Sequence, residues 1–301
     1  MSDYGIPYMG SKAKIAPSLC MMLPNAEHFY DLFGGGFSMT HCMMNSFHKK
    51  YSYFHYNEIK SDVVDLVKRA IKGEFNYDVF QPPWVSREDF FANKDSDAYI
   101  RCLWSFGNNQ KGYLFADDIE ADKRSSHQAV VFGEFDEAAI KVLGFDRWPK
   151  VVKTIKHRRL YWRQKVAFNS NGMEQLERLL QLQQLLHLEQ LQQLEQLQQL
   201  EQLSFYAKSY DEVDILPSSV VYCDIPYEGV RDYGKFDRKK FLDWAASRDF
   251  PVYISEYNIS DNRFKNVYSI DKRSMLKGSL KGNRNKSEKL YWNGETASLL
   301  S

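Results

Sequence analysis

The sequence contains little cysteine and no cysteine pattern. Its four cysteines show neither a paired spacing nor a histidine partner at metal-ligand spacing: Cys20, Cys42, Cys102 and Cys223. This scarcity excludes a disulfide-stapled secreted domain and a structural zinc site. We therefore expect a protein of the reducing cytoplasm that holds no metal.

Long apolar runs and an excess of one charge are missing too. No apolar stretch is long enough to cross a bilayer and the amino end shows no signal pattern, so we expect no membrane contact. The net charge is +1, so any contact with nucleic acid must come from local basic patches. What the chain does have is 44% hydrophobic and 15% aromatic residues, enough for a full core and a second small domain.

The most informative segment is Asp224-Ile225-Pro226-Tyr227, which directly follows the apolar run 220–223. The run predicts a buried strand with the tetrapeptide at its carboxyl end. Asp224 and the carbonyl of Ile225 or Pro226 can each accept one hydrogen of an exocyclic amine, which aims the nitrogen lone pair at a methyl donor. Tyr227 offers a ring on which an extruded flat base can stack. A catalytic role for Asp224, Pro226 and Tyr227 competes with a simpler interpretation, a strand-ending turn with a satisfied Asp.

Two segments near the amino end are typical of a site for a nucleoside cofactor. Residues 30–38 predict a strand end that runs into a glycine turn and then a helix. Glycine lets a ligand approach the backbone closely, although a glycine turn alone is often only a turn. About twenty residues later, residues 53–58 predict a second strand that ends in an acid, and a carboxylate at that offset can bind both hydroxyls of a ribose.

With these blocks in this order, the chain resembles the Dam-type DNA adenine methyltransferases, particularly phage-borne ones. The similar blocks are Pro7 to Lys12 at the amino end, Asp31 to Ser38 in the glycine turn, Asn57-Glu58 at the ribose step and Asp224 to Tyr227 at the catalytic site. The resemblance is strong over residues 1–65 and 204–295, and between them it is confined to residues 104–113. It implies S-adenosyl-L-methionine as the methyl donor and the N6 amine of a flipped adenine in double-stranded DNA as the acceptor.

The resemblance also implies which residues bind the cofactor. The amino-terminal block would close over the methionine end of the donor, and Ser209-Tyr210-Asp211 is similar to the segment that lines its adenine. The expected cofactor-binding residues are Tyr8, Lys12, Asp31, Phe33, Gly35, Glu58, Ser209 and Tyr210. The sequence departs from the family pattern at Phe37, which replaces the second glycine, at Ile225, which replaces a proline, and at Ser209, which replaces an acid.

Residues 66–170 lack a sustained alternation of strands and helices and contain two candidate DNA-binding features. In residues 106–111, small and amide side chains can reach base edges or form only a polar turn. The candidates there are Asn108, Asn109 and Lys111.

From Arg147 to Lys165, eight Lys and Arg residues occur without an acid and are interleaved with three aromatics. This basic run favours phosphate contact over a solvated face, and its candidates are Arg158, Arg159 and Arg163.

Leucine recurs at every third position from Leu176 to Leu203, within repeats of LEQLQQ. The composition favours a helix, but a spacing of three slips by roughly 60° per step against a 3.6-residue turn, so the leucines of a straight helix would wind around it. Stacked short turns are the alternative. For the role of this repeat, we favour an expansion tolerated at a loop over an arm that contacts DNA or a second subunit.

Beyond the tetrapeptide, the pattern predicts a loop over residues 229–236 that can close on the base. It then predicts a helix over 238–247 and strands over 251–257 and 289–292. The basic, small-residue stretch 278–286 predicts either a hairpin turn or a contact near the target base.

The predicted fold is therefore an α/β fold of the class I methyltransferase type, a Rossmann-like, mostly parallel sheet with helices on both faces. Residues 1–65 and 204–301 would form the catalytic domain, 66–170 a target-recognition insertion and 171–203 the repeat segment. The predicted activity is site-specific adenine methylation without a metal. Methylation of the exocyclic amine of cytosine and a catalytically decayed DNA-binding protein are the alternatives. We expect a monomer or weak dimer, and a restriction endonuclease is compatible as a partner.

Overall fold

The computed structural model describes residues 4–169, 182–198, 200–227, 236–270 and 287–294, of which residues 166–169 are described without their side chains. The chain divides into two compact units. Unit 1 takes its described residues from Met1–Gly5, Ser11–Val64 and Leu197–Ser301, and unit 2 takes them from Ile6–Gly10 and Asp65–Gln196.

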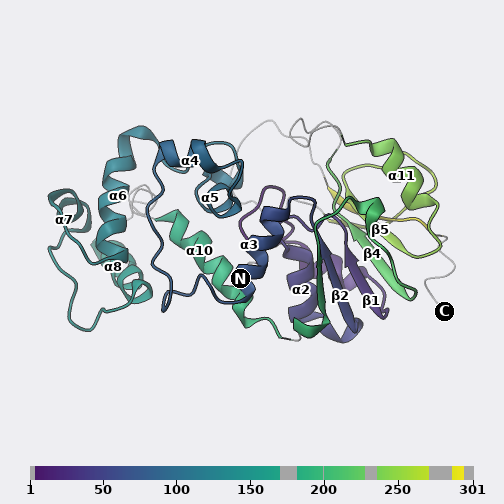
Figure 1. Cartoon of the computed structure of the whole chain (residues 1–301), viewed down its shortest axis with the longest axis horizontal. Coiled ribbons are helices and arrows are strands. Elements are labelled where there is room, and N and C mark those ends of the chain that lie inside the picture. Colours follow the sequence, from purple (N-terminus) through teal and green to yellow (C-terminus); the bar gives the residue numbers. More distant parts are fainter. Residues whose placement is uncertain (1–3, 170–181, 199, 228–235, 271–286, 295–301) are drawn as a thin grey trace. The chain divides into compact units, whose positions relative to one another are not determined.

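Unit 1 is built on a seven-stranded sheet of order β3-β2-β1-β4-β5-β7-β6. Figure 1 labels β2, β1, β4 and β5 of this sheet. Five neighbouring strands run parallel: β3 (Leu203–Tyr206), β2 (Tyr53–Asn57), β1 (His28–Asp31), β4 (Ser219–Cys223) and β5 (Val252–Glu256). β7 (Glu288–Trp292) is antiparallel to β5, and β6 (Lys265–Ile270) is antiparallel to β7. The predicted strands are confirmed within a residue or two, and the mostly parallel sheet fits the predicted class I methyltransferase fold.

The burial of the strands explains why they pair in parallel. β1, β4 and β5 are buried at every position, which is typical of parallel strands that are covered on both faces. On one face, Phe241 of α11 (Arg238–Ala246) packs in a core cluster with Tyr30. Tyr30 pairs in register with His55, so the next residue, Tyr56, points to the opposite face. There it meets the ring of Phe37, which precedes α2 (Ser38–Ser46), at 5.0 Å.

The remaining helices of unit 1 are short. α1 (Ala16–Met22) packs on α2, and α3 (Ser61–Ile71) follows β2 and continues into unit 2. α11 starts and ends within a residue of the predicted helix.

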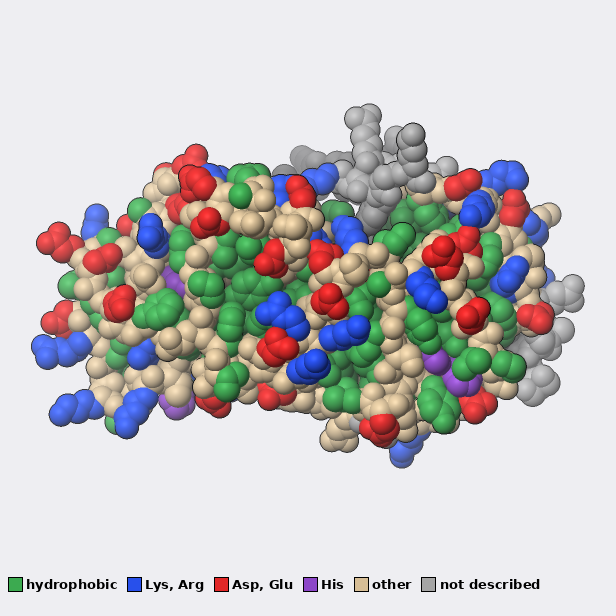
Figure 2. Space-filling view, in the orientation of Figure 1, with side chains coloured by type: hydrophobic (Ala, Val, Ile, Leu, Met, Phe, Trp, Pro, Cys, Tyr) green, Lys and Arg blue, Asp and Glu red, His purple; other side chains and the backbone are tan. Residues whose placement is uncertain are grey.

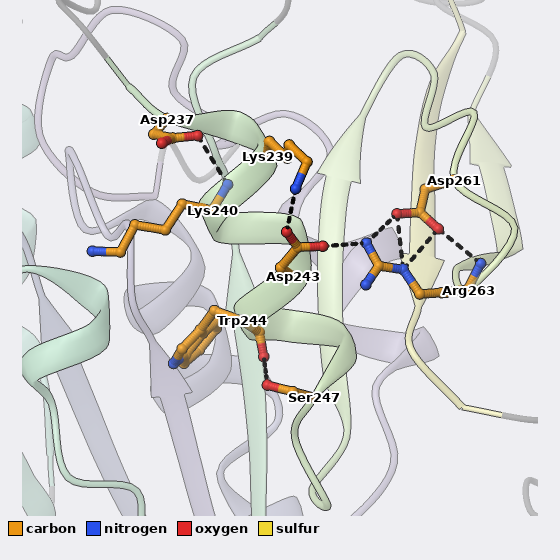
Figure 3. A network of polar contacts seen from close by, with 8 residues as sticks. All are labelled: Asp237, Lys239, Lys240, Asp243, Trp244, Ser247, Asp261 and Arg263. Atoms are coloured by element: carbon orange, nitrogen blue, oxygen red, sulfur yellow. Dashed lines mark hydrogen bonds and ion pairs between the residues drawn. The ribbon is translucent and has the colours of Figure 1, made fainter.

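A surface network of charged side chains holds α11 (Figure 3). The Asp237 carboxylate caps the helix by accepting from the Lys240 backbone N–H at 2.9 Å. Asp243 accepts from Arg263 at 2.8 Å, and Arg263 also pairs with Asp261 at 2.6 Å. Water and salt screen exposed pairs of this kind, so they add little to stability, and the orientation of α11 depends mainly on its buried face.

Unit 2 is helical over most of its described residues. Its helices are α4 (Arg87–Asn93), α5 (Ala98–Leu103), α6 (Asp117–Val131), α7 (Glu137–Leu143), α8 (Ile155–Asn169) and α10 (Gln183–Gln193). Trp84 stacks on Phe115 at 5.6 Å and meets Trp104 edge-on at 5.1 Å. A second cluster joins α6, α7, α8 and the start of the α10 segment.

The surface carries no charge excess of one sign on the face that Figure 2 shows, where acidic and basic side chains are intermixed. No helix among the described residues is long and apolar enough to cross a membrane. All four cysteines are buried and free.

The described part of the leucine repeat is helical. α10 continues into a 3₁₀ turn at Leu194–Gln196, and a second 3₁₀ turn at Leu200–Gln202 leads into β3. Four leucines of the series that recurs at every third position are fully buried: Leu185, Leu188, Leu191 and Leu194. They wind around α10 as expected for a helix, and they are all buried because neighbouring segments cover the helix on several sides. His187, between two of these leucines, is likewise buried and bonds the carbonyl of Leu103 at 2.7 Å.

The helix prediction is therefore confirmed for residues 183–193. Our interpretation of the repeat as an expansion tolerated at a loop is wrong for its described part, because these leucines fill the core of unit 2.

Burial predicts unequal effects for two neighbouring leucines of α10. Leu188 is fully buried, whereas Leu186 is 37% exposed. Leu188→Ala should lower the free energy of unfolding by about 2–5 kcal/mol, because it removes buried methyl groups and leaves a cavity. Leu186→Ala, the matched control, should cost less than about 1 kcal/mol. Urea unfolding of the whole chain measures both, and equal losses would contradict the packing of the repeat.

Candidate active site

Three carboxylates converge at one edge of the sheet, because the strands that carry them are parallel neighbours. Asp31 ends β1, Glu58 follows β2 and Asp224 follows β4. The Asp31 Oδ2 atom accepts from the Thr40 hydroxyl at 2.9 Å, whereas its buried Oδ1 has no hydrogen-bond partner among the described residues. Burial raises the pKa of Asp31 to about 7, and the charges of Asp224 and Glu58 add to the rise. This edge therefore favours a cationic ligand.

The glycine turn after β1 holds Glu58 in place. A Cβ atom at Gly34 would lie 2.2 Å from the ring of Tyr56, so only glycine fits there. Gly35 has a φ of 46° and its N–H donates to Glu58 Oε2 at 3.0 Å. The N–H of Lys60 donates to Oε1 at 3.1 Å. Burial raises the pKa of Glu58, and these two hydrogen bonds oppose the rise.

Asn57 links the ends of three strands. Its Nδ2 donates to the carbonyls of Leu32 at 2.9 Å and Lys208 at 3.0 Å, and its Oδ1 accepts from the N–H of Lys208 at 3.1 Å. Asn57 is 1% exposed. It thereby fixes the glycine turn after β1 relative to the segment that follows β3.

Phe33 and Tyr210 form an aromatic pair at the same edge. Their ring centroids lie 5.5 Å apart with an interplanar angle of 25°. The Tyr210 hydroxyl is buried and has no hydrogen-bond partner among the described residues. Ser209 caps the 3₁₀ turn at Tyr210–Glu212, and its hydroxyl donates to the carboxylate of Asp211. Ser209 therefore shapes the turn that places Tyr210.

Phe37 adopts the backbone conformation that favours glycine. Its φ is 66°, a left-handed conformation that costs a side-chain-bearing residue roughly 1–2 kcal/mol. The ring is fully buried between Tyr56 and His41, and this burial offsets the strain. The departure from glycine at this position therefore has a structural reason.

Lys12 lies on the carboxylate of Asp224. Its Nζ is 2.7 Å from both Oδ1 and Oδ2, and its side chain is 7% exposed. Burial raises the pKa of Asp224 to about 6, while the charge and hydrogen bond of Lys12 lower it. Lys12 thus favours the ionised form of Asp224, the form that can accept hydrogens from an amine. The departure at Ile225 is accommodated by burial of its side chain in the core of unit 1.

Tyr227 is held from three sides. Its hydroxyl donates to Glu288, its ring lies 4.8 Å from the Lys12 ammonium, and the ring of Tyr257 meets it edge-on at 4.6 Å. Sequence reasoning missed Glu288 and Tyr257. The signal for Tyr257 was its place at the end of β5, beside the tetrapeptide strand. For Glu288, a single acid at the start of an apolar strand was the sole hint.

The description of this edge of unit 1 does not include three other predicted segments. Tyr8 lies in Ile6–Gly10, which groups with unit 2. The loop predicted over residues 229–236 falls outside the described residues except for Phe236, and the stretch 278–286 falls outside them entirely.

The candidate DNA-binding loop of unit 2 is a closed turn. A bridge pairs Ser105 with Tyr113, and Asn109 Oδ1 accepts from the backbone N–H of Lys111 at 2.8 Å. Asn108 has a φ of 59°. Phe106 is 65% exposed, so the turn presents an aromatic ring and Lys111 to solvent.

The basic run divides into structural and exposed residues. Arg158 donates to the carbonyls of Val130 and Val131, at 3.1 and 3.0 Å, where α6 ends. Arg159 pairs with Glu189 of α10. Arg163, by contrast, is exposed on α8, as are Lys156 and Lys165. Trp148 and Trp162 of the run pack in the second core cluster of unit 2, and the ring of Tyr161 contacts that of Trp148.

The described residues at the edge of unit 1 suit a nucleoside cofactor. They provide a carboxylate held by the glycine turn, an aromatic pair and a buried carboxylate oxygen without a partner. No group of three or more His, Cys, Asp or Glu among the described residues could hold a metal ion.

A family model described as D12 class N6 adenine-specific DNA methyltransferase matches residues 8–250. This range includes the glycine turn, the ribose-step residues and the tetrapeptide. No curated protein matches the chain.

The Lys12–Asp224 contact predicts how stability depends on pH. Because the folded-state pKa of Asp224 is raised, its contribution to stability is full below the unfolded pKa of about 4 and is lost as the pH rises through about 6. Lys12→Met removes the cation that lowers this pKa, so the loss should move to higher pH. The free energy of unfolding, measured between about pH 4 and pH 9, checks this. Lys14→Met, an exposed neighbour, is the control, and identical profiles for Lys12→Met and wild type would contradict the assignment.

Proposed function

Because the chain belongs to the D12 class N6 adenine-specific DNA methyltransferases, we propose that its methyl donor and target base meet at the carboxyl ends of β1, β2 and β4. The chain is an enzyme that methylates the N6 amine of adenine in DNA, as the sequence predicted. The observation that carries the proposal is the convergence of Asp31, Glu58 and Asp224 at one edge of unit 1. No observation favours the amine of cytosine.

S-adenosyl-L-methionine fits the residues at the ends of β1, β2 and β3. When bound there, it supplies a methyl group whose bond to sulfur breaks with the electron pair staying on sulfur. Glu58 accepts from the ribose hydroxyls through the lone pairs that its two backbone donors leave free. Asp31 complements the positive charge of the donor, and Phe33 and Tyr210 line the adenine.

Asp224 and Tyr227 receive the target adenine. The carboxylate of Asp224 accepts one hydrogen of the amine, and the carbonyl of Ile225 or Pro226 accepts the other. The nitrogen lone pair is then free to form the new bond to carbon. Asp224 can take the proton that the amine loses as this bond forms. Pro226 fixes the backbone that carries the acceptor carbonyl, and Tyr227 stacks on the extruded base.

Unit 2 is proposed to bind the DNA duplex. Its exposed basic residues on α8, among them Arg163, suit phosphates, and the turn with Asn108, Asn109 and Lys111 suits base edges. Arg158 and Arg159 hold α6 and α10, so their contribution to DNA binding would act through the shape of unit 2.

Two variants separate chemistry from donor binding. Asp224→Ala should lower the single-turnover rate of methyl transfer by at least about 100-fold, because a positioned acceptor is lost, and leave donor affinity near wild type. Glu58→Ala should weaken the binding free energy of the donor by about 1.5–3 kcal/mol, because it removes charge-assisted contacts to the ribose. Calorimetry and transfer of tritium-labelled methyl to unmethylated plasmid DNA measure these effects. Near-wild-type transfer by Asp224→Ala would disprove the proposed chemistry.

The salt dependence of DNA binding tests the exposed part of the basic run. Replacing Lys156 and Arg163 by Ala should reduce the magnitude of the slope of log affinity against log salt by roughly one to two units. Each lost phosphate contact lowers that magnitude by about 0.9. The control replaces Lys72 and Lys141, which are exposed in unit 2 outside the run, with the same change in charge. If both double variants keep the wild-type slope, α8 does not face DNA.

A further inference from the structure

Glu288 is a buried carboxylate beside the proposed chemistry, and it lies outside the range matched by the family model. It is the first residue of β7 and is 1% exposed. β7 runs antiparallel to β5, with Lys289 paired to Glu256. The start of β7 therefore lies at the same edge of the sheet as the carboxyl ends of the parallel strands.

Glu288 contacts both groups that surround Asp224. Its carboxylate accepts from the hydroxyl of Tyr227, and its Oε1 lies 3.8 Å from Lys12 Nζ. The same ammonium is 2.7 Å from Asp224. Lys12 thus lies between two carboxylates, closer to Asp224 than to Glu288.

This arrangement has to change when a target amine arrives. Lys12 contacts both oxygens of Asp224, so at least one oxygen must turn from the ammonium to the hydrogen of the amine. A buried ammonium left without a partner would be costly. Glu288 is close enough to keep the ammonium paired after a small movement.

We propose that Glu288 is a positioning residue for methyl transfer: it receives the Lys12 ammonium when Asp224 engages the target amine, and it fixes the Tyr227 ring through the phenol hydroxyl. The inference rests on the proposed roles of Asp224 and Tyr227. It involves no covalent step, only an exchange of hydrogen-bond and ion-pair partners within unit 1.

Glu288→Gln and Tyr227→Phe separate the two parts of this role. Glu288→Gln keeps an acceptor for the Tyr227 hydroxyl but removes the charge that draws Lys12 from Asp224. It should lower the single-turnover rate by about 10- to 100-fold, by analogy with the loss of a group that orients a metal ligand. Tyr227→Phe keeps the ring and the charge of Glu288. It should mainly raise the KM for DNA, because the ring is less firmly held.

The pH profile of the rate distinguishes positioning from a general structural effect. The groups that face Asp224 are Lys12, Glu288 and Tyr227. Tyr222 of β4 and Asp31 of β1 also interact with its charge. Glu288 raises the pKa of Asp224, so Glu288→Gln should move the acid limb of the profile to lower pH. Asp243→Asn is the control, since Asp243 lies in the surface network of α11 (Figure 3). It should keep the wild-type rate and profile.

The test uses the full chain, tritium-labelled S-adenosyl-L-methionine and unmethylated plasmid DNA. A wild-type chain that transfers no methyl would refute the proposed function, and with it the inference that rests on it, whereas the variants test the inference alone. If wild type is active and a folded Glu288→Gln keeps its rate within twofold and its acid limb unmoved, the inference is wrong. Should Glu288→Gln fail to fold, Glu288→Asp, which keeps the charge but withdraws it by one methylene, must still slow transfer. A wild-type rate in a folded Glu288→Asp would also overturn the proposal.

Discussion

The contact between the Lys12 ammonium and the Asp224 carboxylate is the interaction on which the site depends. Burial at the edge of unit 1 disfavours the ionised form of a carboxylate, and neighbouring carboxylates add to this effect, as the raised pKa of Asp31 illustrates. Lys12 opposes this effect at Asp224, which in the proposed mechanism must be ionised to accept hydrogens from the amine. That mechanism requires the Lys12 ammonium near the carboxylate for its charge, and requires it to move aside when the amine binds. The carboxylate of Glu288 lies 3.8 Å from the Lys12 ammonium, close enough to pair with the ammonium when it moves away from Asp224.

The part of the site that lies on parallel strands could be predicted from the sequence. A strand buried on both faces reads as a continuous apolar run, and a polar residue directly after such a run must lie at the carboxyl edge of the sheet. This reasoning predicted Glu58 and Asp224 at strand ends and the resemblance added Asp31, and the structure brings all three to one edge. The sequence also predicted the glycine turn. The structure shows why glycine is needed there, since a Cβ atom at Gly34 would lie 2.2 Å from the ring of Tyr56.

The remainder depends on contacts that sequence patterns do not carry. Glu288 reaches the site because β7 runs antiparallel, a direction that an isolated apolar run does not reveal. The basic run was read as one surface, but Arg158 and Arg159 are drawn to the carbonyls at the end of α6 and to Glu189, and only burial distinguishes them from Arg163. The leucine repeat was judged by its period, whereas its burial is decided by the segments packed around α10. Period predicts which side chains share a stripe, and it does not predict how much of a helix is covered.

The central claim is that this chain methylates the N6 amine of adenine with the Asp224 edge of unit 1 as its active site. Mass spectrometry of nucleosides from unmethylated DNA, incubated with the purified chain and deuterium-labelled S-adenosyl-L-methionine, tests it most directly. We expect labelled N6-methyladenine that requires the donor. Labelled N4-methylcytosine, or no labelled nucleoside with a folded chain that binds the donor, would contradict it.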